Sequence, residues 1–312
     1  MTDERDLRVR DMIQANKRTV TFNSIIEKCI PTILFIIAII SILTTIGILF
    51  TLIRETIYFF RDVPFLDFFT GTKLKPLGDA AEFGILPLLT GTFISSAIAM
   101  LVAIPIGLMS AVFLSEYASD KVRRILKPIL EVLAGIPTIV YGFFAFTFVT
   151  PLLNRFIPML EPTNILSPGL VMGVMIIPMI ASLSEDAMSS VPNAMREGAL
   201  GLGSTKLEVT WRVVIPAAMS GIISSFVLGI SRAIGETMIV AIASGSSKNF
   251  TFDVTQSMQT MTAYIVEVTG GDAPAGSTLY YSLYAVAFTL FVFTLIMNLI
   301  AQYISKKFRE GY

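Results

Sequence analysis

Residues 191–216 read VPNAMREGALGLGSTKLEVTWRVVIP and separate two long apolar runs. Their pattern predicts a helix, a turn and a second helix. Pro192 suits the first position of a helix, and Gly203 can adopt the left-handed conformation that ends one. Thr205 and Glu208 are three residues apart, the spacing of a capping box that starts the next helix. We therefore expect a short helical hairpin with small residues on its surface.

The chain as a whole has the composition of an integral membrane protein. Of its 312 residues, 54% are hydrophobic and only 15% are charged, whereas a soluble domain carries about 25% charged residues. Lys and Arg together number 23, as do Asp and Glu, so no basic excess exists for binding nucleic acid. There is no histidine, and Cys29 is the single cysteine, which excludes His-based zinc and nucleophile sites and any internal disulfide. We expect no catalytic residue, no metal site and no cofactor.

Six apolar runs approach the length of about 20 residues that a helix needs to cross a bilayer. They cover residues 29–53, 83–115, 128–153, 169–183, 221–244 and 281–304. The fourth run is the shortest. The sequence therefore predicts an all-α, polytopic membrane protein with six transmembrane helices.

The distribution of Lys and Arg predicts the orientation, because short cytoplasmic loops carry the positive excess. Basic residues gather in the N-terminal segment 1–28, between the second and third runs, and in the tail 306–312. We place these segments and 184–220 in the cytoplasm, so that both termini are cytoplasmic. The remaining connections lie outside, at residues 54–82, 154–168 and 245–280. The first run lacks the features of a cleavable signal peptide, so we expect it to be a transmembrane helix.

Arg232 and Glu236 are the only charges more than about one helical turn inside a predicted span. Four residues apart, they would share one face of a helix. An arginine near the bilayer centre costs at least ~2.5–3.5 kcal/mol on insertion scales, so it should face protein or a water-filled cavity.

Three roles for this pair remain open. The two charges could neutralise each other and only fasten the bundle. Alternatively, Arg232 is a cationic step for an anion that crosses the membrane, Glu236 holds it and lowers its pull, and Ser231 and Thr237 add hydroxyl donors. In the third role the pair joins a neighbouring subunit.

The hairpin resembles the EAA loop of ABC importer permeases, whose pattern is E-A-A-x3-G-x9-I-x-L-P. The matching residues are Glu197, Ala199, Gly203 and Pro216, and the departures are Gly198, Val213 and Ile215. In that family the loop is a coupling helix that docks into a groove of the ATP-binding subunit. The resemblance implies that Glu197, Gly198, Ala199 and Gly203 lie at the docking surface. An amphipathic hairpin on the membrane surface is the alternative.

Residues 201–206 contain glycine, serine, threonine and lysine but lack the spacing of a phosphate-binding P-loop. We therefore expect ATP hydrolysis to belong to another subunit, and this chain not to be an enzyme.

The stretch RAIGETM at residues 232–238 looks like the fifth-span signature of phosphate-specific ABC importer permeases, and its methionine resembles the C-type permease. Further matches lie at residues 68–73, 83–92, 114–118, 133–142, 183–188 and 262–265. Leu74 departs from the family, which commonly has tryptophan there. The resemblance implies a type I ABC importer (MetI-like) permease fold. Its five-helix core would cover 83–305 with the coupling loop at 192–216, and the helix at 29–53 would be an addition to that core.

The resemblance also implies a function. The chain would be the permease subunit of an ATP-driven importer of inorganic phosphate in the bacterial cytoplasmic (inner) membrane. Its partners would be an A-type permease subunit, a dimer of ATP-binding subunits, a phosphate-binding protein at the external loops, and membrane lipid. An arginine alone does not distinguish phosphate from molybdate or sulfate, so another oxyanion is the alternative substrate. A membrane enzyme or an ion channel is the alternative of a different class.

Overall fold

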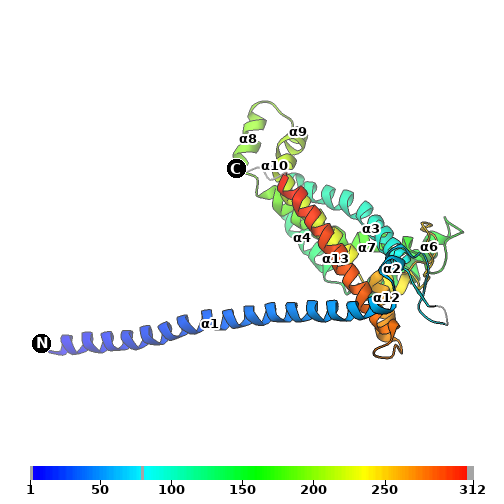
Figure 1. Ribbon diagram of the computed structural model, residues 1–312. Coiled ribbons are helices and arrows are strands. Elements are labelled where there is room, and N and C mark those ends of the chain that lie inside the picture. Colours follow the sequence, from blue (N-terminus) through cyan, green and yellow to red (C-terminus); the bar gives the residue numbers. More distant parts are fainter. Residues whose placement is uncertain (1–2, 79–80, 308–312) are drawn as a thin grey trace. The chain divides into compact units, whose positions relative to one another are not determined.

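The computed structural model describes residues 3–78 and 81–307, with side chains for residues 29–78 and 81–306. The basic side chains expected in the segment 1–28, and the tail beyond residue 307, lie outside this description. Within the described residues the protein is almost entirely helical (Figure 1). Its one small sheet is the antiparallel pair β1 (Leu74–Lys75) and β2 (Glu82–Phe83). The predicted all-α class is confirmed.

Five helical segments of the described chain are long and apolar enough to cross a membrane. The first is the part Cys29–Asp62 of α1 (Asp3–Asp62). The others are α3 (Leu86–Val112) with the π-helical turn η1 (Phe113–Tyr117), α7 (Leu166–Ser189), α10 (Ile215–Ile234) with the residues from Lys206 that lead into it, and α13 (Thr278–Lys307) up to Lys306. A bent pair of helices supplies the sixth span if its two parts count as one. The predicted number of six spans is therefore confirmed on that count.

The N-terminal part of α1 forms a unit of its own, residues 1–54, separate from the unit formed by residues 55–312. Its apolar side chains are exposed, as Phe35 at 65% and Phe50 at 68% illustrate. Exposed apolar side chains along a helix of membrane length are what a lipid-facing span requires. The helix continues to Asp62, so part of the segment 54–82 that we expected to be a loop is helical.

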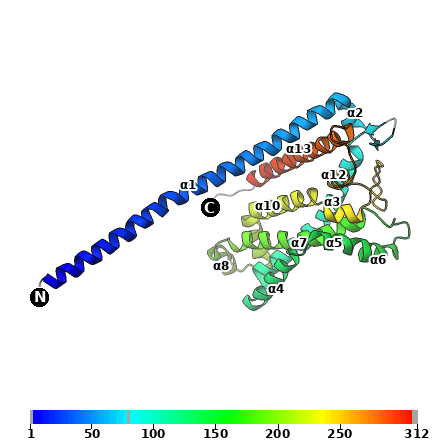
Figure 2. The same ribbon diagram turned by 90° about the horizontal axis from the view of Figure 1, so that it is seen from below.

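The third predicted span is not one straight helix. It consists of α4 (Asp120–Ala134), followed after a bend of 85° by α5 (Thr138–Phe144), the π-helical turn η2 (Ala145–Val149) and α6 (Thr150–Asn154). Figure 2 shows α4 leaving the direction of α5 and α6. The bend falls at Gly135–Pro137, because proline supplies no backbone donor and disfavours the helical conformation of the preceding residue.

The fifth predicted span is also interrupted. Helix α10 ends at Ile234, and a short helix, α11 (Met238–Ala243), follows after three residues. The expectation of one continuous helix over 221–244 is therefore wrong. Gly235 has a low helix propensity, and the side chain of Glu236 offers an acceptor to the amides of a new helix start.

The core of the bundle lies between α3 and α7, which pack together through glycines. A Cβ atom on Gly173 would lie 2.7 Å from Cβ of Val102, and one on Gly107 would lie 2.8 Å from a methyl carbon of Ile180. Small residues allow this close approach of membrane helices. Helix α10 packs against α7 and α13 (Figure 2).

The connections gather at two ends of the bundle formed by residues 55–312. At one end lie α2 (Phe65–Thr70), the small sheet and α12 (Met261–Gly270). The backbone there joins all three segments that we predicted to be external, through a bridge between Lys73 and Asn249 and a 3.0 Å bond from Glu161 N–H to the Thr255 carbonyl. At the other end lie α8 (Asn193–Gly201), α9 (Lys206–Val209) and the π-helical turn η3 (Thr210–Val214) (Figure 1).

Candidate functional site

The hairpin at residues 192–216 forms as its sequence predicts. Helix α8 follows Pro192 and closes at Gly203, whose φ of 88° lies in the left-handed region. The N–H of Ser204 donates to the carbonyl of Ala199 at 3.2 Å, and that of Gly203 donates to the carbonyl of Leu200 at 2.9 Å. These two bonds constitute a Schellman motif, which satisfies carbonyls that the helix end leaves free.

The second helix of the hairpin starts at the predicted capping box. The N–H of Glu208 donates to Oγ1 of Thr205 at 3.3 Å, and the N–H of Thr205 donates to Oε2 of Glu208 at 2.9 Å. This helix is only one turn long and leads through η3 directly into α10. The hairpin is therefore joined to a membrane-length helix without an intervening loop.

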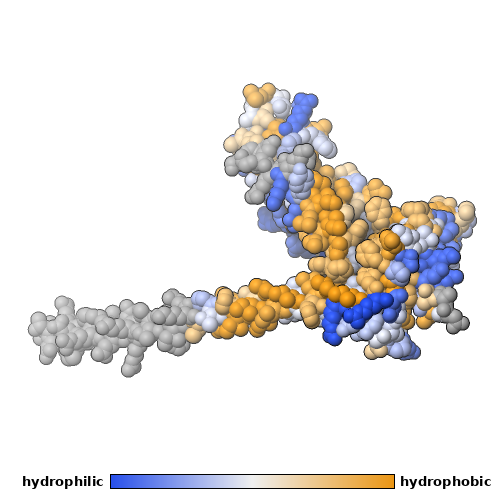
Figure 3. Space-filling model, in the orientation of Figure 1, coloured by the Kyte–Doolittle hydropathy of each residue, from blue (hydrophilic) through white to orange (hydrophobic). Residues whose placement is uncertain are grey.

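The outer surface of the hairpin is open. Glu197, Gly198 and Gly203 are exposed and Ala199 is half-buried. A Cβ atom built on Gly198 or Gly203 would meet no atom of the described chain within 4 Å. Exposed apolar side chains occur in the same hairpin: Leu202 is 90% exposed, and Leu207 and Trp211 are each 58% exposed. Figure 3 shows hydrophobic and hydrophilic surface side by side at this end of the bundle. Apolar surface at the tip of a hairpin is typical of a docking site for another protein.

Ion pairs that the sequence did not predict fasten this end of the bundle. The buried carboxylate of Glu185, near the end of α7, binds the guanidinium of Arg123 and accepts from Nζ of Lys127 at 2.9 Å. Nζ of Lys127 also lies 2.9 Å from Asp186. Arg123 and Lys127 are one helical turn apart on α4. Their i, i+4 spacing in the sequence indicates that the two basic side chains share one face of a helix. Arg196 of α8 pairs with Glu116 of η1 at 3.0 Å.

Arg232 lies in the last turn of α10 and is exposed. Among the described residues, no carboxylate lies within ion-pair distance of its guanidinium, and no hydrogen bond satisfies it. Within the described part of the chain, Arg232 is thus a cation without a partner, next to Ala233 of the apolar core.

Glu236 is 8% exposed and uses its carboxylate on the backbone. Its Oε1 accepts from the N–H of Met238 at 3.0 Å and from that of Ile239 at 3.3 Å. These amides are the free donors at the start of α11. The expected Arg232–Glu236 ion pair is absent because the interruption after Ile234 removes Glu236 from the face of α10, so the view of Glu236 as a holder of Arg232 needs correction.

The two hydroxyl residues of the predicted site have different surroundings. Ser231 Oγ lies 3.0 Å from the Val227 carbonyl oxygen and within hydrogen-bond distance of Oδ1 of Asn298 on α13, and its single hydrogen can be donated to either acceptor. Thr237 occupies the position just before α11 and is half-buried. The four predicted residues therefore lie along one short stretch, and among them Arg232 is the charged group with an open side chain.

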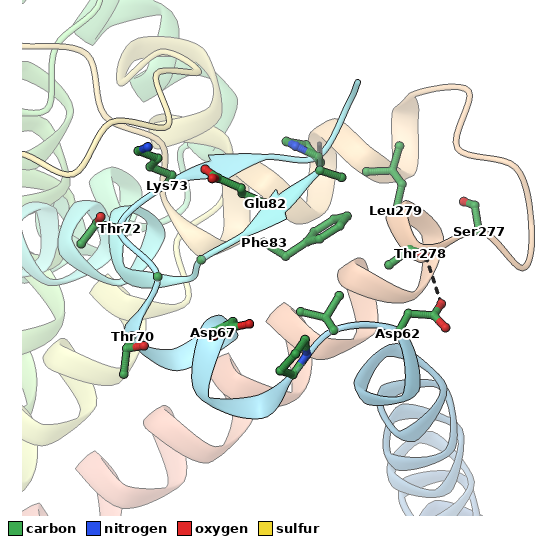
Figure 4. Close-up of a pocket in the computed structure, with 16 residues that line it drawn as sticks. Asp62, Asp67, Thr70, Thr72, Lys73, Glu82, Phe83, Ser277, Thr278 and Leu279 are labelled. Atoms are coloured by element: carbon green, nitrogen blue, oxygen red, sulfur yellow. Dashed lines mark hydrogen bonds between the residues drawn. The ribbon is translucent and has the colours of Figure 1, made fainter. Parts of the chain in front are cut away.

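A cavity of about 780 Å³ lies at the opposite end from the hairpin. Figure 4 shows Asp62 and Asp67 on one side of it, and Lys73 and Glu82 on or beside the small sheet across from them. The hydroxyl of Thr278, where α13 begins, donates to Asp62 at 3.0 Å. Three carboxylates against one lysine make this cavity unsuited to an anion.

These features define a class of protein: a bundle of membrane-length helices with an exposed helical hairpin at one end and, in one of those helices, an arginine that has no ion-pair partner among the described residues. The chain belongs to the family of binding-protein-dependent transport system inner membrane components, whose sequence profile matches residues 103–310. The chain is therefore a multi-pass membrane protein of the ABC importer family.

Two relatives cover most of this chain. It is 31% identical over 242 residues to the probable ABC transporter permease protein YqgH of Bacillus subtilis, an alignment that covers 78% of each chain. It is 34% identical over 257 residues to the phosphate transport system permease protein PstC of Xylella fastidiosa (strain 9a5c), covering 76% of this chain and 78% of the relative.

A solved structure supports the fold. A chain of the bacterial alginate ABC transporter, crystallised with an alginate pentasaccharide-bound periplasmic protein, matches with a TM-score of 0.63 and 17% identity. The match covers 90% of this chain and 96% of that chain. The predicted type I ABC importer permease fold is confirmed.

Proposed function

We propose that this chain is the permease subunit of an ATP-driven importer of inorganic phosphate. The observation that carries the proposal is Arg232, an exposed arginine without a counter-ion among the described residues, at the end of a membrane-length helix. A planar guanidinium suits the oxygens of a tetrahedral anion, and a charge in the membrane is costly unless it has such a use. The PstC relative, named as a phosphate transport system permease, supports phosphate as that anion.

The path for the anion would run past Arg232 and the hydroxyl of Ser231. Glu236 contributes by accepting from the first amides of α11, so that the helix break lies next to the arginine. Thr237, which precedes α11, would add a hydroxyl donor to the path. Without a paired carboxylate, Arg232 offers its full charge to the substrate. An A-type permease subunit would complete the path on the open side of this arginine.

Energy would enter at the hairpin. The exposed residues Glu197, Gly198 and Gly203 and the half-buried Ala199 would lie at the groove of an ATP-binding subunit, and the exposed Leu202 would add apolar contact area. Since residues 201–206 lack the P-loop spacing, the dimer of ATP-binding subunits would hydrolyse ATP, and the permease itself would not be an enzyme.

The remaining partner and the orientation follow from the two ends of the bundle. A phosphate-binding protein would dock on the end formed by 54–82, 154–168 and 245–280, which would face outward. The hairpin and both termini would face the cytoplasm of a bacterial cell, with the five-helix core at 83–305 in its inner membrane. The Lys- and Arg-rich connections support this orientation.

The test is the Arg232→Gln variant of the fully assembled importer in proteoliposomes. A charge-assisted hydrogen bond contributes about 1.5–3 kcal/mol, so the uptake of radiolabelled phosphate should fall about 10- to 100-fold. The ATP-binding subunits should remain bound, because Arg232 lies away from the hairpin. The same assay measures how strongly an excess of sulfate, molybdate or unlabelled phosphate inhibits the uptake of radiolabelled phosphate.

Arg124→Gln is the matched control, because Arg124 is an exposed arginine on α4 with no hydrogen bond or ion pair among the described residues. It should transport at the rate of the unchanged protein. Full uptake by Arg232→Gln would remove the role of Arg232. Stronger inhibition by molybdate or sulfate than by unlabelled phosphate would transfer the proposal to another oxyanion.

A further inference from the structure

Arg196 is the most highly connected side chain of the hairpin. It lies in α8 directly before Glu197, and its side chain is only 17% exposed. Nη2 donates to Oε1 of Glu116 at 3.0 Å and to the carbonyl of Met188 at 2.7 Å. Nη1 donates to the carbonyl of Val191 and to Oδ1 of Asn193 at 3.3 Å. A single guanidinium therefore holds together three separate elements.

Each of these elements has one of its ends close to the Arg196 side chain. Met188 and Val191 carry carbonyls of the last turn of α7 and of the residues just beyond it, where a helix is short of donors and is the negative end of its dipole. Glu116 belongs to η1, the π-helical turn that closes α3, and its side chain is only 7% exposed. Asn193 starts α8 itself. A buried, bidentate contact of this kind fixes direction as well as distance.

Apart from the packing of Met195 and Ala199 against the apolar cluster that contains Met188 and Val191, the hairpin faces open space. A cavity of about 490 Å³ separates α8 and α9 from the ends of α3, α4 and α7, and Arg196, Glu116 and Lys206 line it. Nζ of Lys206 lies 5.0 Å from the ring centroid of Tyr117 on η1 and makes a second, weaker attachment to the same turn. The cavity leaves room for α8 to move, and Arg196 is the contact that such a movement would pull.

The elements held by Arg196 lead to the proposed anion path. Helix α7 packs against both α3 and α10, and α10 carries Arg232. Within this contact, Oγ of Ser184 on α7 and Oγ of Ser225 on α10 form a buried hydrogen bond of 2.8 Å. A displacement applied to the end of α7 can therefore reach α10 through packed helices.

We infer that Arg196 is the positioning residue that transmits movement of the docking hairpin to α3 and α7, through its bond to Glu116 and to the carbonyls that end α7. The inference rests on the proposed function, because it requires an ATP-binding subunit that moves the hairpin. In this role, the Arg196–Glu116 pair sets how many phosphate ions cross the membrane per ATP hydrolysed. The pair does not itself bind the ATP-binding subunit, since both side chains are largely buried.

The experiment measures phosphate uptake and ATP hydrolysis together in the complete importer in proteoliposomes. The variants are Arg196→Met, Glu116→Gln and the two combined, with Arg124→Met as the control. We expect Arg196→Met to keep its ATP-binding subunits and its hydrolysis but to lose about tenfold in phosphate transported per ATP, as for the loss of a buried charged pair. The double variant should be no worse than the single ones, because both changes remove one interaction.

Two further variants cover the case in which Arg196→Met does not assemble. Arg196→Lys keeps the charge but loses the fork that reaches both the carboxylate and the carbonyls, so it should assemble and still show the lower ratio. The exchange Arg196→Glu with Glu116→Arg should recover part of the ratio lost by Arg196→Glu alone. An unchanged ratio in Arg196→Met, or in Arg196→Lys where the former does not assemble, overturns the inference.

Failure of the proposed function would look different. In that case the unchanged importer would show no phosphate uptake or no hydrolysis coupled to it. A normal ratio in the unchanged importer combined with a normal ratio in the Arg196 variants would contradict the inference alone and leave the proposed function standing.

Discussion

Two glycines of the hairpin, Gly203 and Gly198, differ in whether their backbone conformation would tolerate a side chain. Gly203 has a φ of 88°, a conformation that L-residues rarely adopt, and it closes α8. Gly198 lies within α8, where a Cβ atom would meet nothing within 4 Å. The first glycine is required by its backbone conformation, whereas the second only weakens its helix.

Alanine at these positions should therefore act in opposite directions. Gly198→Ala should stabilise α8 by about 0.5–1 kcal/mol through helix propensity, and Gly203→Ala should destabilise its end by about 1–2 kcal/mol through left-handed strain. Amide hydrogen exchange over residues 193–204 measures both, with slower exchange expected in the first variant and faster exchange in the second. Faster exchange in Gly198→Ala would mean that this glycine has a contact that the chain alone does not show.

Features of the hairpin were predictable from sequence because they depend on neighbours within a few residues. The helix end at Gly203 and the capping box of Thr205 and Glu208 are local, and both formed as expected. The pairing of Arg232 with Glu236 also looked local, but it required an unbroken helix between them. The backbone amides of α11 compete for the carboxylate of Glu236, and nothing in the i, i+4 spacing reveals that competition.

At the scale of elements, prolines in the apolar runs have unequal effects. Pro105 lies inside α3 and Pro178 inside α7 without ending either helix. Pro137 stands at the 85° bend between α4 and α5. On the near side of this bend, α4 carries Arg123 and Lys127, which pair with Glu185 and Asp186 near the end of α7. The position of the proline can be read from the sequence, but the residues that lie around it in the fold cannot.

The packing of α3 on α7 gives a prediction about helix spacing. A Cβ atom on Gly173 of α7 would lie 2.7 Å from Cβ of Val102 and 2.9 Å from the Ala99 carbonyl of α3, so the two backbones must separate. Overpacking of this kind costs about 1–3 kcal/mol. We expect Gly173→Ala to lower the midpoint of thermal unfolding of the purified protein in detergent.

Gly229→Ala on α10 is the matched comparison. The atoms nearest to its added Cβ are the side-chain ends of Ile180 and Met100, each at 3.2 Å, which can move aside. Its unfolding midpoint should stay above that of Gly173→Ala. Equal midpoints for the two variants would show that α3 and α7 separate at little cost and do not form the rigid centre of the bundle.

At the scale of the whole molecule, charge is sorted between the two ends of the unit formed by residues 55–312. The hairpin end holds the paired groups Arg196–Glu116 and Arg123–Glu185, and the opposite end holds the acidic cavity with Asp62, Asp67 and Glu82. A net charge of zero over the chain conceals this arrangement. The distribution of basic residues in the sequence predicted which connections share an end of the bundle. The contacts between these connections join residues far apart in the sequence, so no single segment could predict them.

The orientation of these two ends in the membrane gives the last prediction. Cys29 is the only cysteine, so Cys29→Ser provides a background without thiols. Onto it we place either Met159→Cys, in the connection 154–168, or Leu202→Cys, at the hairpin tip; these side chains are 80% and 90% exposed in the structure. A maleimide that does not cross membranes should label the Met159→Cys variant in intact cells, and the Leu202→Cys variant only after solubilisation in sodium dodecyl sulfate. Equal labelling of the two variants in solubilised samples is the control for thiol reactivity. Labelling of the Leu202→Cys variant in intact cells would contradict the proposed orientation, because the hairpin would then face away from any supply of ATP.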